Sequence, residues 1–284
     1  MSEKQIFNKA YVEITNVCNL NCSFCKGTDR KKEFMTVENF RVAAQQVRKV
    51  TGYIYLHLLG EPTLHPQLSE ILDVCKELDF KVIITTNGTL LEKIKEVLLN
   101  SEALHKVNIS LHAFEANSGI DFDKYLDSCF DFAKTIQEKG KICVLRLWNG
   151  DNDGKYRENK LNDSIISKLK ARFAEEWKEN SKGYRIREKL FLEFAERFEW
   201  RENDEKDGKI NCYGLRDQIG VLVDGTVVPC CIDCDGVIAL GNVFEDDILD
   251  IINSPLAKSI SEGFRNGKAV HPYCKKCGFV RTRL

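Results

Sequence analysis

Apolar and polar positions alternate with two different periods along the first half of the chain. Short apolar runs bounded by turn residues predict strands, whereas apolar positions three and four residues apart predict amphipathic helices. The expected strands lie at residues 11–15, 53–59, 81–85, 107–112 and 142–148. The expected helices lie at 36–50, with Thr36 as a possible cap, at 67–78, in a segment that ends at 99, and at 123–139. Strands that alternate with helices of this length imply a parallel sheet with right-handed crossovers.

The pattern changes after residue 149. The expected segments are a polar loop at 149–157, a charged helix at 164–177, an apolar segment at 189–194, a charged linker at 201–209, a β-hairpin at 218–230 and a short helix near 247–253. The apolar segment would be a sixth parallel strand. We therefore expect an α/β fold: a partial (β/α)6 TIM-like barrel in residues 1–204 and a small domain of β-hairpin and helix in residues 205–284.

Composition and charge exclude several classes of protein. The 284 residues carry 42 Lys and Arg against 43 Asp and Glu, a net charge of −1, so no global basic field favours nucleic acid. No apolar run approaches the roughly 20 residues that span a bilayer. The N-terminus lacks the basic-then-apolar order of a signal peptide. We expect a cytoplasmic protein that binds neither nucleic acid nor membrane.

Twelve cysteines in a reducing compartment do not indicate a disulfide framework. Those at 75, 129 and 143 lie in apolar periodic stretches and are expected to be small core residues. Cys18, Cys22 and Cys25 instead have the spacing C-x3-C-x2-C directly after the first strand. Three thiolates leave one iron of a four-iron cluster open to a small molecule. The alternative is a zinc knuckle with a distant fourth ligand.

The motifs at the ends of the first four strands resemble the radical S-adenosylmethionine superfamily. Besides the three cysteines, with Phe24 before the third, they are Gly60-Glu61-Pro62, Thr85-Thr86-Asn87-Gly88 and Asn108-Ile-Ser110-Leu-His112. Reactive groups of parallel sheets and barrels gather at these carboxyl ends. The resemblance covers residues 10–148 and is specific as a set.

This resemblance implies a role for each motif. The three cysteines would hold a 4Fe-4S cluster, and Glu61 would accept the methionine ammonium of S-adenosylmethionine. The other residues expected at the cofactor are Phe24, Gly60, Pro62, Thr86, Asn87, Ser110 and Arg146. His112 is the candidate catalytic residue, because strand alternation would place it on the same face as Asn108 and Ser110. A core histidine and a surface salt bridge are the alternatives for His112 and Arg146.

A second group of cysteines lies in the C-terminal part. Cys212, Cys230, Cys274 and Cys277, with the hairpin between the first two, resemble the SPASM or twitch extension that holds an auxiliary 4Fe-4S cluster in some radical enzymes. The resemblance implies that these four thiolates are its ligands. Cys231 or Cys234 could replace one of them, and a structural zinc site is the alternative.

The implied activity is reductive cleavage of S-adenosylmethionine to a 5′-deoxyadenosyl radical that abstracts hydrogen from a substrate. Few residues precede the first strand, which favours a small molecule over a peptide. The layout loosely resembles queuine lyase-like enzymes, for whose base Glu13, Glu193, Tyr53 and Trp148 are available. Alternatives are an aminocyclitol dehydrogenase, a peptide-modifying enzyme and a non-catalytic iron–sulfur or zinc redox sensor. Flavodoxin or ferredoxin is the expected reductant.

Overall fold

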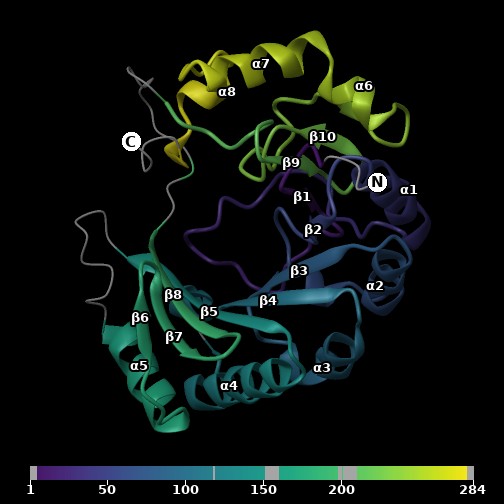
Figure 1. Cartoon of the computed structure of the whole chain (residues 1–284). Helices are drawn as coiled ribbons and strands as arrows, with labels where there is room; N and C mark the ends of the chain where they lie inside the picture. The colour runs from purple at the N-terminus through teal and green to yellow at the C-terminus, as the bar shows by residue number, and fades with distance from the viewer. Residues whose placement is uncertain (1–4, 118, 151–159, 198–199, 201–209, 280–284) are drawn as a thin grey trace. The chain divides into compact units, whose positions relative to one another are not determined.

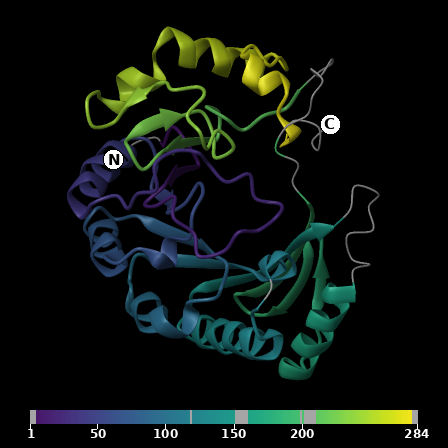
Figure 2. The same cartoon turned by 180° about the vertical axis from the view of Figure 1, so that it is seen from behind.

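The chain forms two compact units in a computed structural model that describes residues 5–117, 119–150, 160–197, 200 and 210–279. Unit 1 comprises residues 1–18, 26–82 and 199–284, and unit 2 comprises residues 19–25 and 83–198. Figure 1 labels the elements of both, and Figure 2 shows the same chain from behind. The segment between residues 12 and 37, drawn in purple, contains no helix or strand.

Unit 1 contains a sheet of mixed direction. Its strands are β1 (Lys9–Val12), β2 (Tyr53–Tyr55), β9 (Gln218–Val221), β10 (Thr226–Val228) and β11 (Gly241–Asn242). β1 pairs in parallel with β2 and with β9, and β10 pairs antiparallel with β9 and β11. The predicted C-terminal hairpin therefore continues the sheet that begins with β1, with Lys9 opposite Gln218.

The helices of unit 1 are mostly amphipathic. They are α1 (Val37–Arg48), the 3-10 turn η1 (Pro62–Leu64), α2 (Leu68–Glu77), α6 (Ile248–Ile252), α7 (Pro255–Arg265) and α8 (Pro272–Lys275). Thr36 caps α1 as expected, because its side chain accepts a hydrogen bond from the Asn39 amide. α1 packs against α2 with Phe40 and Val47 buried.

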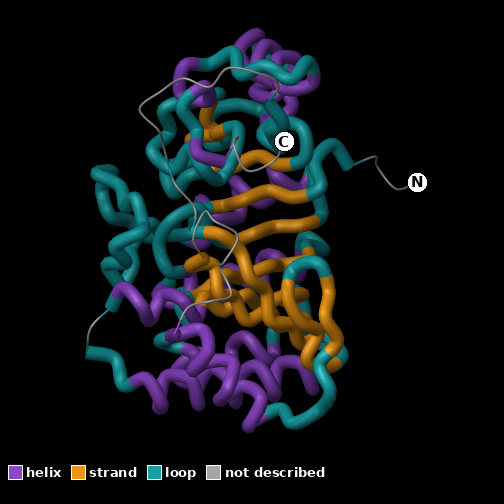
Figure 3. The backbone as a smooth tube through the Cα atoms, turned by 90° about the vertical axis from the view of Figure 1, so that its left-hand side faces the viewer, coloured by secondary structure: helices purple, strands orange, loops and turns teal. Residues whose placement is uncertain are grey.

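Unit 2 is built around three parallel strands. They are β4 (Leu104–Ser110), β5 (Ile142–Gly150) and β8 (Leu190–Glu196), and β7 (Gly183–Arg187) and β6 (Lys178–Asn180) extend them antiparallel. The helices are α3 (Leu91–Asn100), the 3-10 helix η2 (Leu111–Ala116), α4 (Phe122–Glu138) and α5 (Lys160–Arg172). α4 packs against β5 and β8, and the strands run side by side in Figure 3.

β3 (Lys81–Thr86) begins in unit 1 and ends in unit 2. The expected sixth parallel strand is confirmed, because β8 pairs in parallel with β5. The charged hairpin of β6 and β7 was not predicted. The expected helix at 164–177 starts earlier and ends at Arg172, and the strand expected at 53–59 ends at Tyr55.

The strand expected at 107–112 ends at Ser110, so the expectation that His112 alternates with Ser110 on one strand face is wrong. Ser110 is the last residue of β4 and precedes η2 as its N-cap, with φ −84° and ψ 78°. Residues 151–157 of the expected polar loop and the linker at 201–209 lie outside the described residues. The domain boundary near 205 therefore stays a prediction. None of the described helices is long and apolar enough to cross a membrane.

Candidate cluster and cofactor site

The Gly60-Glu61 motif contacts the backbone that leads into Cys18. The Glu61 amide donates to Val17 O at 2.8 Å. Gly60 has φ +73°, and a Cβ there would lie 2.4 Å from Thr15 O. Only glycine allows this backbone approach without displacement. The turn that follows β2 and the backbone that leads into Cys18 are therefore packed together within unit 1.

Glu61 itself is buried, with 2% of its surface exposed. Its Oε1 accepts hydrogen bonds from Thr63 N at 3.1 Å and from Thr63 Oγ1 at 2.6 Å, so it caps η1. Pro62 starts η1 and is also buried. The turn-stabilising role of Glu61 is thus present, and it engages Oε1. A buried carboxylate held in this way is also a pre-organised acceptor for an ammonium group.

The two ends of the cysteine segment are closed against each other by Asn16. Its Nδ2 donates to Lys31 O at 2.8 Å, and its Oδ1 accepts from the Glu33 amide at 2.8 Å. Thr15 Oγ1 also donates to Glu33 O at 2.8 Å. Asn16 is buried, so these bonds are protected from water. They define a closed loop between residues 16 and 33, which we call the cysteine loop.

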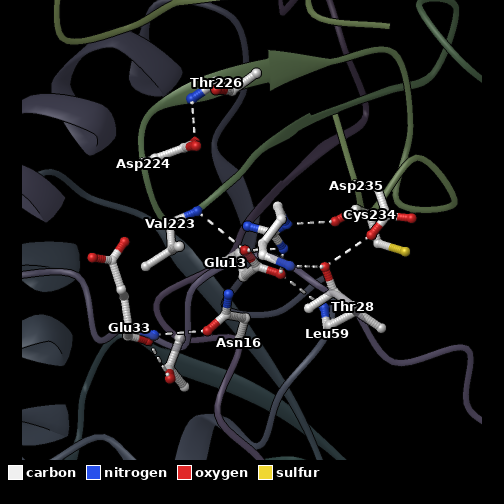
Figure 4. A network of polar contacts seen from close by, with 12 residues as sticks. Glu13, Asn16, Thr28, Glu33, Leu59, Val223, Asp224, Thr226, Cys234 and Asp235 are labelled. Atoms are coloured by element: carbon white, nitrogen blue, oxygen red, sulfur yellow. Dashed lines mark hydrogen bonds and ion pairs between the residues drawn. The ribbon is translucent and has the colours of Figure 1, made fainter. Parts of the chain in front are cut away.

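Glu13 anchors the same region from inside unit 1 (Figure 4). Its carboxylate is fully buried and accepts from Arg30 Nη2 at 2.8 and 2.7 Å, from Leu59 N at 3.3 Å and from Val223 N at 3.1 Å. Arg30 Nε also donates to Cys234 O at 2.9 Å. Glu13 is therefore fully engaged, which removes it from the acceptors available for a substrate base.

The cysteine loop is also joined to the C-terminal segment through Asp235. Thr28 Oγ1 donates to Asp235 Oδ1 at 2.8 Å, and Lys26 forms an ion pair with the same carboxylate. Burial raises the pKa of Asp235, but the hydrogen bonds from Lys26 and Thr28 outweigh burial, so the net pKa is lowered. Contacts between residues 26–30 and residues 234–235 thus fix the later part of the cysteine loop within unit 1.

Cys22 and Cys25 lie together in unit 2. The Cys25 amide donates to Cys22 O at 2.9 Å, and the Cys22 side chain accepts from Asn117 Nδ2 at 3.3 Å. Asn117 Oδ1 accepts in turn from Asn21 N at 3.2 Å. Burial raises the pKa of the Cys22 thiol, the Asn117 hydrogen bond lowers it, and Cys25 raises it. Cys18 is the last residue of its segment in unit 1 and is exposed.

The Thr86-Asn87 motif holds another residue of the cysteine loop. Asn87 Nδ2 donates to Asn19 Oδ1 at 2.9 Å, and Asn19 Nδ2 donates to Thr89 Oγ1 at 2.8 Å. Thr86 Oγ1 accepts from Gly88 N at 3.1 Å. Asn19 and Asn117 were not among the residues expected at the site. The position of Asn19 between two cysteines could have identified it as a residue near the cluster. No motif in the sequence around Asn117 indicated its contact with Cys22.

Phe24 and His112 are neighbours in unit 2, with ring centroids 5.4 Å apart. His112 is 8% exposed, and its Nδ1 lies 3.2 Å from Arg146 O and 3.4 Å from Trp148 N. Burial lowers the pKa of His112 to about 4, so its ring is neutral near pH 7. This environment suits a positioning residue that faces Phe24.

Ser110 and Arg146 are paired across β4 and β5. The Arg146 guanidinium lies 4.2 Å from the centre of the Trp148 ring. Stacking of this kind orients the planar guanidinium and leaves its N–H groups directed sideways. The structure therefore brings together Phe24 with His112, and Ser110 with Arg146, as two pairs in unit 2.

The four C-terminal cysteines of the predicted ligand set line one small cavity in unit 1. Cys212, Cys230, Cys274 and Cys277 share it with apolar residues and Asp233. The Gly214 amide donates to Cys212 Sγ at 3.4 Å. Burial raises the pKa of Cys212, Cys230 and Cys274, and mutual repulsion among the thiolates adds to this. A bound cationic metal centre would reverse that penalty.

Cys231 and Cys234 do not line this cavity. Cys231 lies near Lys9 and Tyr11, and Cys234 is buried near Lys26. Among the described residues, no three His, Cys, Asp or Glu side chains are arranged to hold a single metal ion. An all-sulfur donor set in an apolar cavity fits an iron–sulfur cluster by its chemistry.

Comparisons with known proteins agree with the two cysteine groups. Residues 12–151 match the Radical SAM superfamily, and residues 212–278 match the SPASM iron-sulfur cluster-binding domain. The first match implies a 4Fe-4S cluster and S-adenosylmethionine, and the second implies auxiliary iron–sulfur binding. The α/β partial-barrel class with a C-terminal iron–sulfur domain, expected from sequence, is confirmed.

Two groups of relatives illustrate the likeness. A probable GTP 3′,8-cyclase of Sulfurisphaera tokodaii is 34% identical over 136 residues, 41% of this chain and 40% of that protein. The chain thus spans less than half the length of such curated relatives. The crystal structure of BtrN with AdoMet and 2-DOIA has a TM-score of 0.60 at 20% identity, covering 93% of this chain and 89% of BtrN. Streptococcus suis SuiB bound to S-adenosylmethionine has a TM-score of 0.61 at 20% identity, covering 97% and 72%.

Proposed function

Because the chain belongs to the radical SAM superfamily of enzymes, we propose that it reductively cleaves S-adenosylmethionine and uses the resulting radical on a small-molecule substrate. The main support is the packing of Gly60-Glu61 against Thr15–Val17, since it ties a cofactor-type motif to the cysteine loop. A sensor or structural iron–sulfur protein would need no such motif. The hydrogen bond from the Glu61 amide to Val17 O holds the Glu61 motif beside the backbone that leads into Cys18.

The proposed roles of the first cysteine group and of Glu61 are binding roles. Cys18, Cys22 and Cys25 hold the first 4Fe-4S cluster, and Glu61 accepts the methionine ammonium. When bound, the cluster supplies the electron that converts S-adenosylmethionine to methionine and a 5′-deoxyadenosyl radical. Asn117 donates to Cys22 Sγ and so stabilises negative charge on that sulfur.

The remaining predicted cofactor residues position rather than react. Ser110 and Arg146 offer a hydroxyl and a guanidinium to ribose or carboxylate oxygens. Gly60 and Pro62 shape the turn that carries Glu61. Thr86 and Asn87 hold the turn that supports Asn19. Phe24 packs on His112, which stays neutral and excludes water from this side of the loop.

The C-terminal cysteines are proposed to hold an auxiliary 4Fe-4S cluster through Cys212, Cys230, Cys274 and Cys277. Their common cavity supports this ligand set over one that includes Cys231 or Cys234. Such a cluster either accepts an electron from a substrate radical or orients the substrate. A structural zinc ion in the same cavity is the competing occupant.

The substrate is proposed to be a small molecule, and flavodoxin or ferredoxin the reductant by analogy within the superfamily. Queuine is one of the compounds to test as a substrate. Glu13 is excluded as a partner for its base, because Arg30 and two backbone amides occupy the Glu13 carboxylate. The relatives act on chemically different molecules by name: one is a probable GTP 3′,8-cyclase, one was crystallised with 2-DOIA, and SuiB was crystallised with the precursor peptide SuiA. An aminocyclitol-type alcohol and a peptide therefore belong in the same panel.

Metal content and cofactor cleavage test the proposal together. After anaerobic reconstitution we expect about eight irons per chain and dithionite-dependent formation of 5′-deoxyadenosine. A content of about four irons and one zinc would agree with the proposed activity and would assign the C-terminal cavity to a structural zinc ion. Zinc without iron, or iron without cleavage, would overturn the enzymatic proposal and leave a scaffold or redox sensor.

The variant Glu61→Gln separates cofactor binding from cluster assembly. We expect it to keep its iron and to bind S-adenosylmethionine at least about tenfold more weakly, because a neutral amide replaces the anionic acceptor. Glu70→Gln, on the exposed face of α2, is the matched control and should bind normally. Equal affinity of Glu61→Gln and the unaltered protein would remove Glu61 from the site.

A further inference from the structure

One face of the parallel strands in unit 2 carries charged and polar side chains. Strand pairing places Ser110, Arg146 and Glu193 side by side across β4, β5 and β8. Because side chains alternate along a strand, Lys106 and Asn108 project from β4 on the same face as Ser110. Five polar positions on one face of three strands are unusual for a sheet buried on both sides.

The opposite face of these strands is the ordinary core. Cys143, Leu145 and Leu147 of β5 are fully buried. Cys143 lies close enough to Cys129 of α4 for the two thiols to influence each other. The apolar face therefore packs against α4, and the polar face is turned away from that helix. Packing on α4 does not explain the polar residues.

Two cations lie close to Lys106 on the polar face. Among the described residues, half-buried Lys106 is influenced by Arg146 and Lys182 and by the carboxylate of Glu193. Burial lowers the pKa of Lys106, Arg146 lowers it further, and Glu193 raises it. An anionic group placed beside Lys106 would relieve the repulsion between the cations.

Asn108 provides an independent sign of a ligand at the same place. The residue is fully buried, and its Nδ2 donates to Thr85 Oγ1 at 3.1 Å. No donor among the described residues reaches its Oδ1. A buried carbonyl oxygen without a donor is costly, so it calls for a hydroxyl or amine from another molecule.

We infer that Lys106, Asn108 and Glu193 form a substrate subsite for a small molecule that carries an anionic group next to a hydroxyl or amine. Lys106 binds the phosphate or carboxylate, Asn108 Oδ1 accepts from the neighbouring hydroxyl or amine, and Glu193 accepts from a second one. Arg146 keeps the role proposed above, toward the carboxylate of S-adenosylmethionine. This inference rests on the proposed function and narrows its substrate class to polar anions.

Small probes test the subsite in the reconstituted protein saturated with S-adenosylmethionine. Anaerobic calorimetry would compare D-ribose 5-phosphate, D-ribonate and neutral D-ribose. We expect at least one anion to bind about tenfold more tightly than ribose. The phosphate and carboxylate arms identify which anionic group Lys106 prefers. Equal, weak binding of all three compounds would overturn the inference.

Two lysine variants decide whether the preference belongs to this face. Lys106→Gln should abolish the preference for the anion and change the affinity for S-adenosylmethionine less than twofold. Lys124→Gln, on the exposed surface of α4, should retain the preference. Loss of the anion preference in both variants would indicate nonspecific charge attraction. Weakened S-adenosylmethionine binding in Lys106→Gln would assign Lys106 to the cofactor site. Either result would contradict the subsite. If the unaltered protein binds no S-adenosylmethionine, the proposed function fails instead.

Discussion

Arg30 Nη2 donates to both carboxylate oxygens of Glu13, at 2.8 Å and 2.7 Å, and the Glu13 side chain is completely shielded from solvent. Glu13 follows β1, and Arg30 lies in the cysteine loop. The same two side chains also bind the backbone at Leu59, Val223 and Cys234. One buried ion pair therefore holds together the Arg30 end of the cysteine loop, the segment that follows β2 and the C-terminal segment within unit 1.

Removal of one partner should be strongly destabilising. Arg30→Met leaves the Glu13 carboxylate buried without its counter-charge, which costs about 3–5 kcal/mol in comparable pairs. Lys31→Met is the matched control, since Lys31 pairs with Glu33 at the surface with 83% of its side chain exposed, and should cost less than about 1 kcal/mol. Urea unfolding measures both, and similar losses in the two variants would contradict the structural role of the pair.

Gly60→Ala should impair the first cluster. The new Cβ would meet the backbone at Thr15 O, Asn16 Cα and Val17 O, so the cysteine loop must move. Gly27→Ala is the control, because Gly27 has a similar φ of +65° and nothing within 4 Å of its Cβ position. The control should lose only about 1–2 kcal/mol of stability and keep its iron. Iron analysis should show about four irons fewer in Gly60→Ala; equal iron content would disprove this prediction.

Asn117→Ala should lower the reduction potential of the first cluster. The Asn117 Nδ2 hydrogen bond to Cys22 Sγ stabilises the more negative, reduced state, so its loss makes reduction harder. A redox titration followed by electron paramagnetic resonance measures the shift. Asn100→Ala, at the exposed end of α3, should leave the potential unchanged. A raised or unchanged potential in Asn117→Ala would show that this contact does not tune the cluster.

Adjacent cysteines should differ in their effect on the auxiliary cluster. Cys230→Ser removes a thiol from the four-cysteine cavity and should lower the iron content by about four. Cys231→Ser alters a thiol near Lys9 and Tyr11 and should leave the iron content unchanged. Equal loss of iron in both variants would place Cys231 among the ligands.

Buried, neutral His112 should make stability depend on pH. Its folded pKa of about 4 lies below the unfolded value of 6.5, so the unfolded state binds more protons between these values. Stability is therefore full above pH 6.5 and falls as the pH drops, by about 2 kcal/mol between pH 7 and pH 5 from this group. His112→Gln should remove that part of the pH dependence. An unaltered dependence in unfolding experiments would mean that His112 is not buried as a neutral ring.

Local sequence patterns were sufficient for much of the fold. The expected strand at 189–194 corresponds to β8, and the capping threonine of α1 lies at Thr36 as expected. The pattern was insufficient where backbone geometry changed within an apolar run. Strand periodicity continued through His112, but the chain leaves the sheet at Ser110, and His112 then binds the backbone of β5 instead.

Cysteine spacing and motif order by themselves determined the superfamily, the cofactor class and the candidate ligand groups, because these depend on residue identity at short separations. Only the tertiary structure decided that β9 pairs with β1, that Cys231 and Cys234 lie outside the four-cysteine cavity, and that the Glu13 carboxylate forms an ion pair with Arg30. These features join residues far apart along the chain. Such contacts depend on how complete elements pack and not on any local pattern of residues.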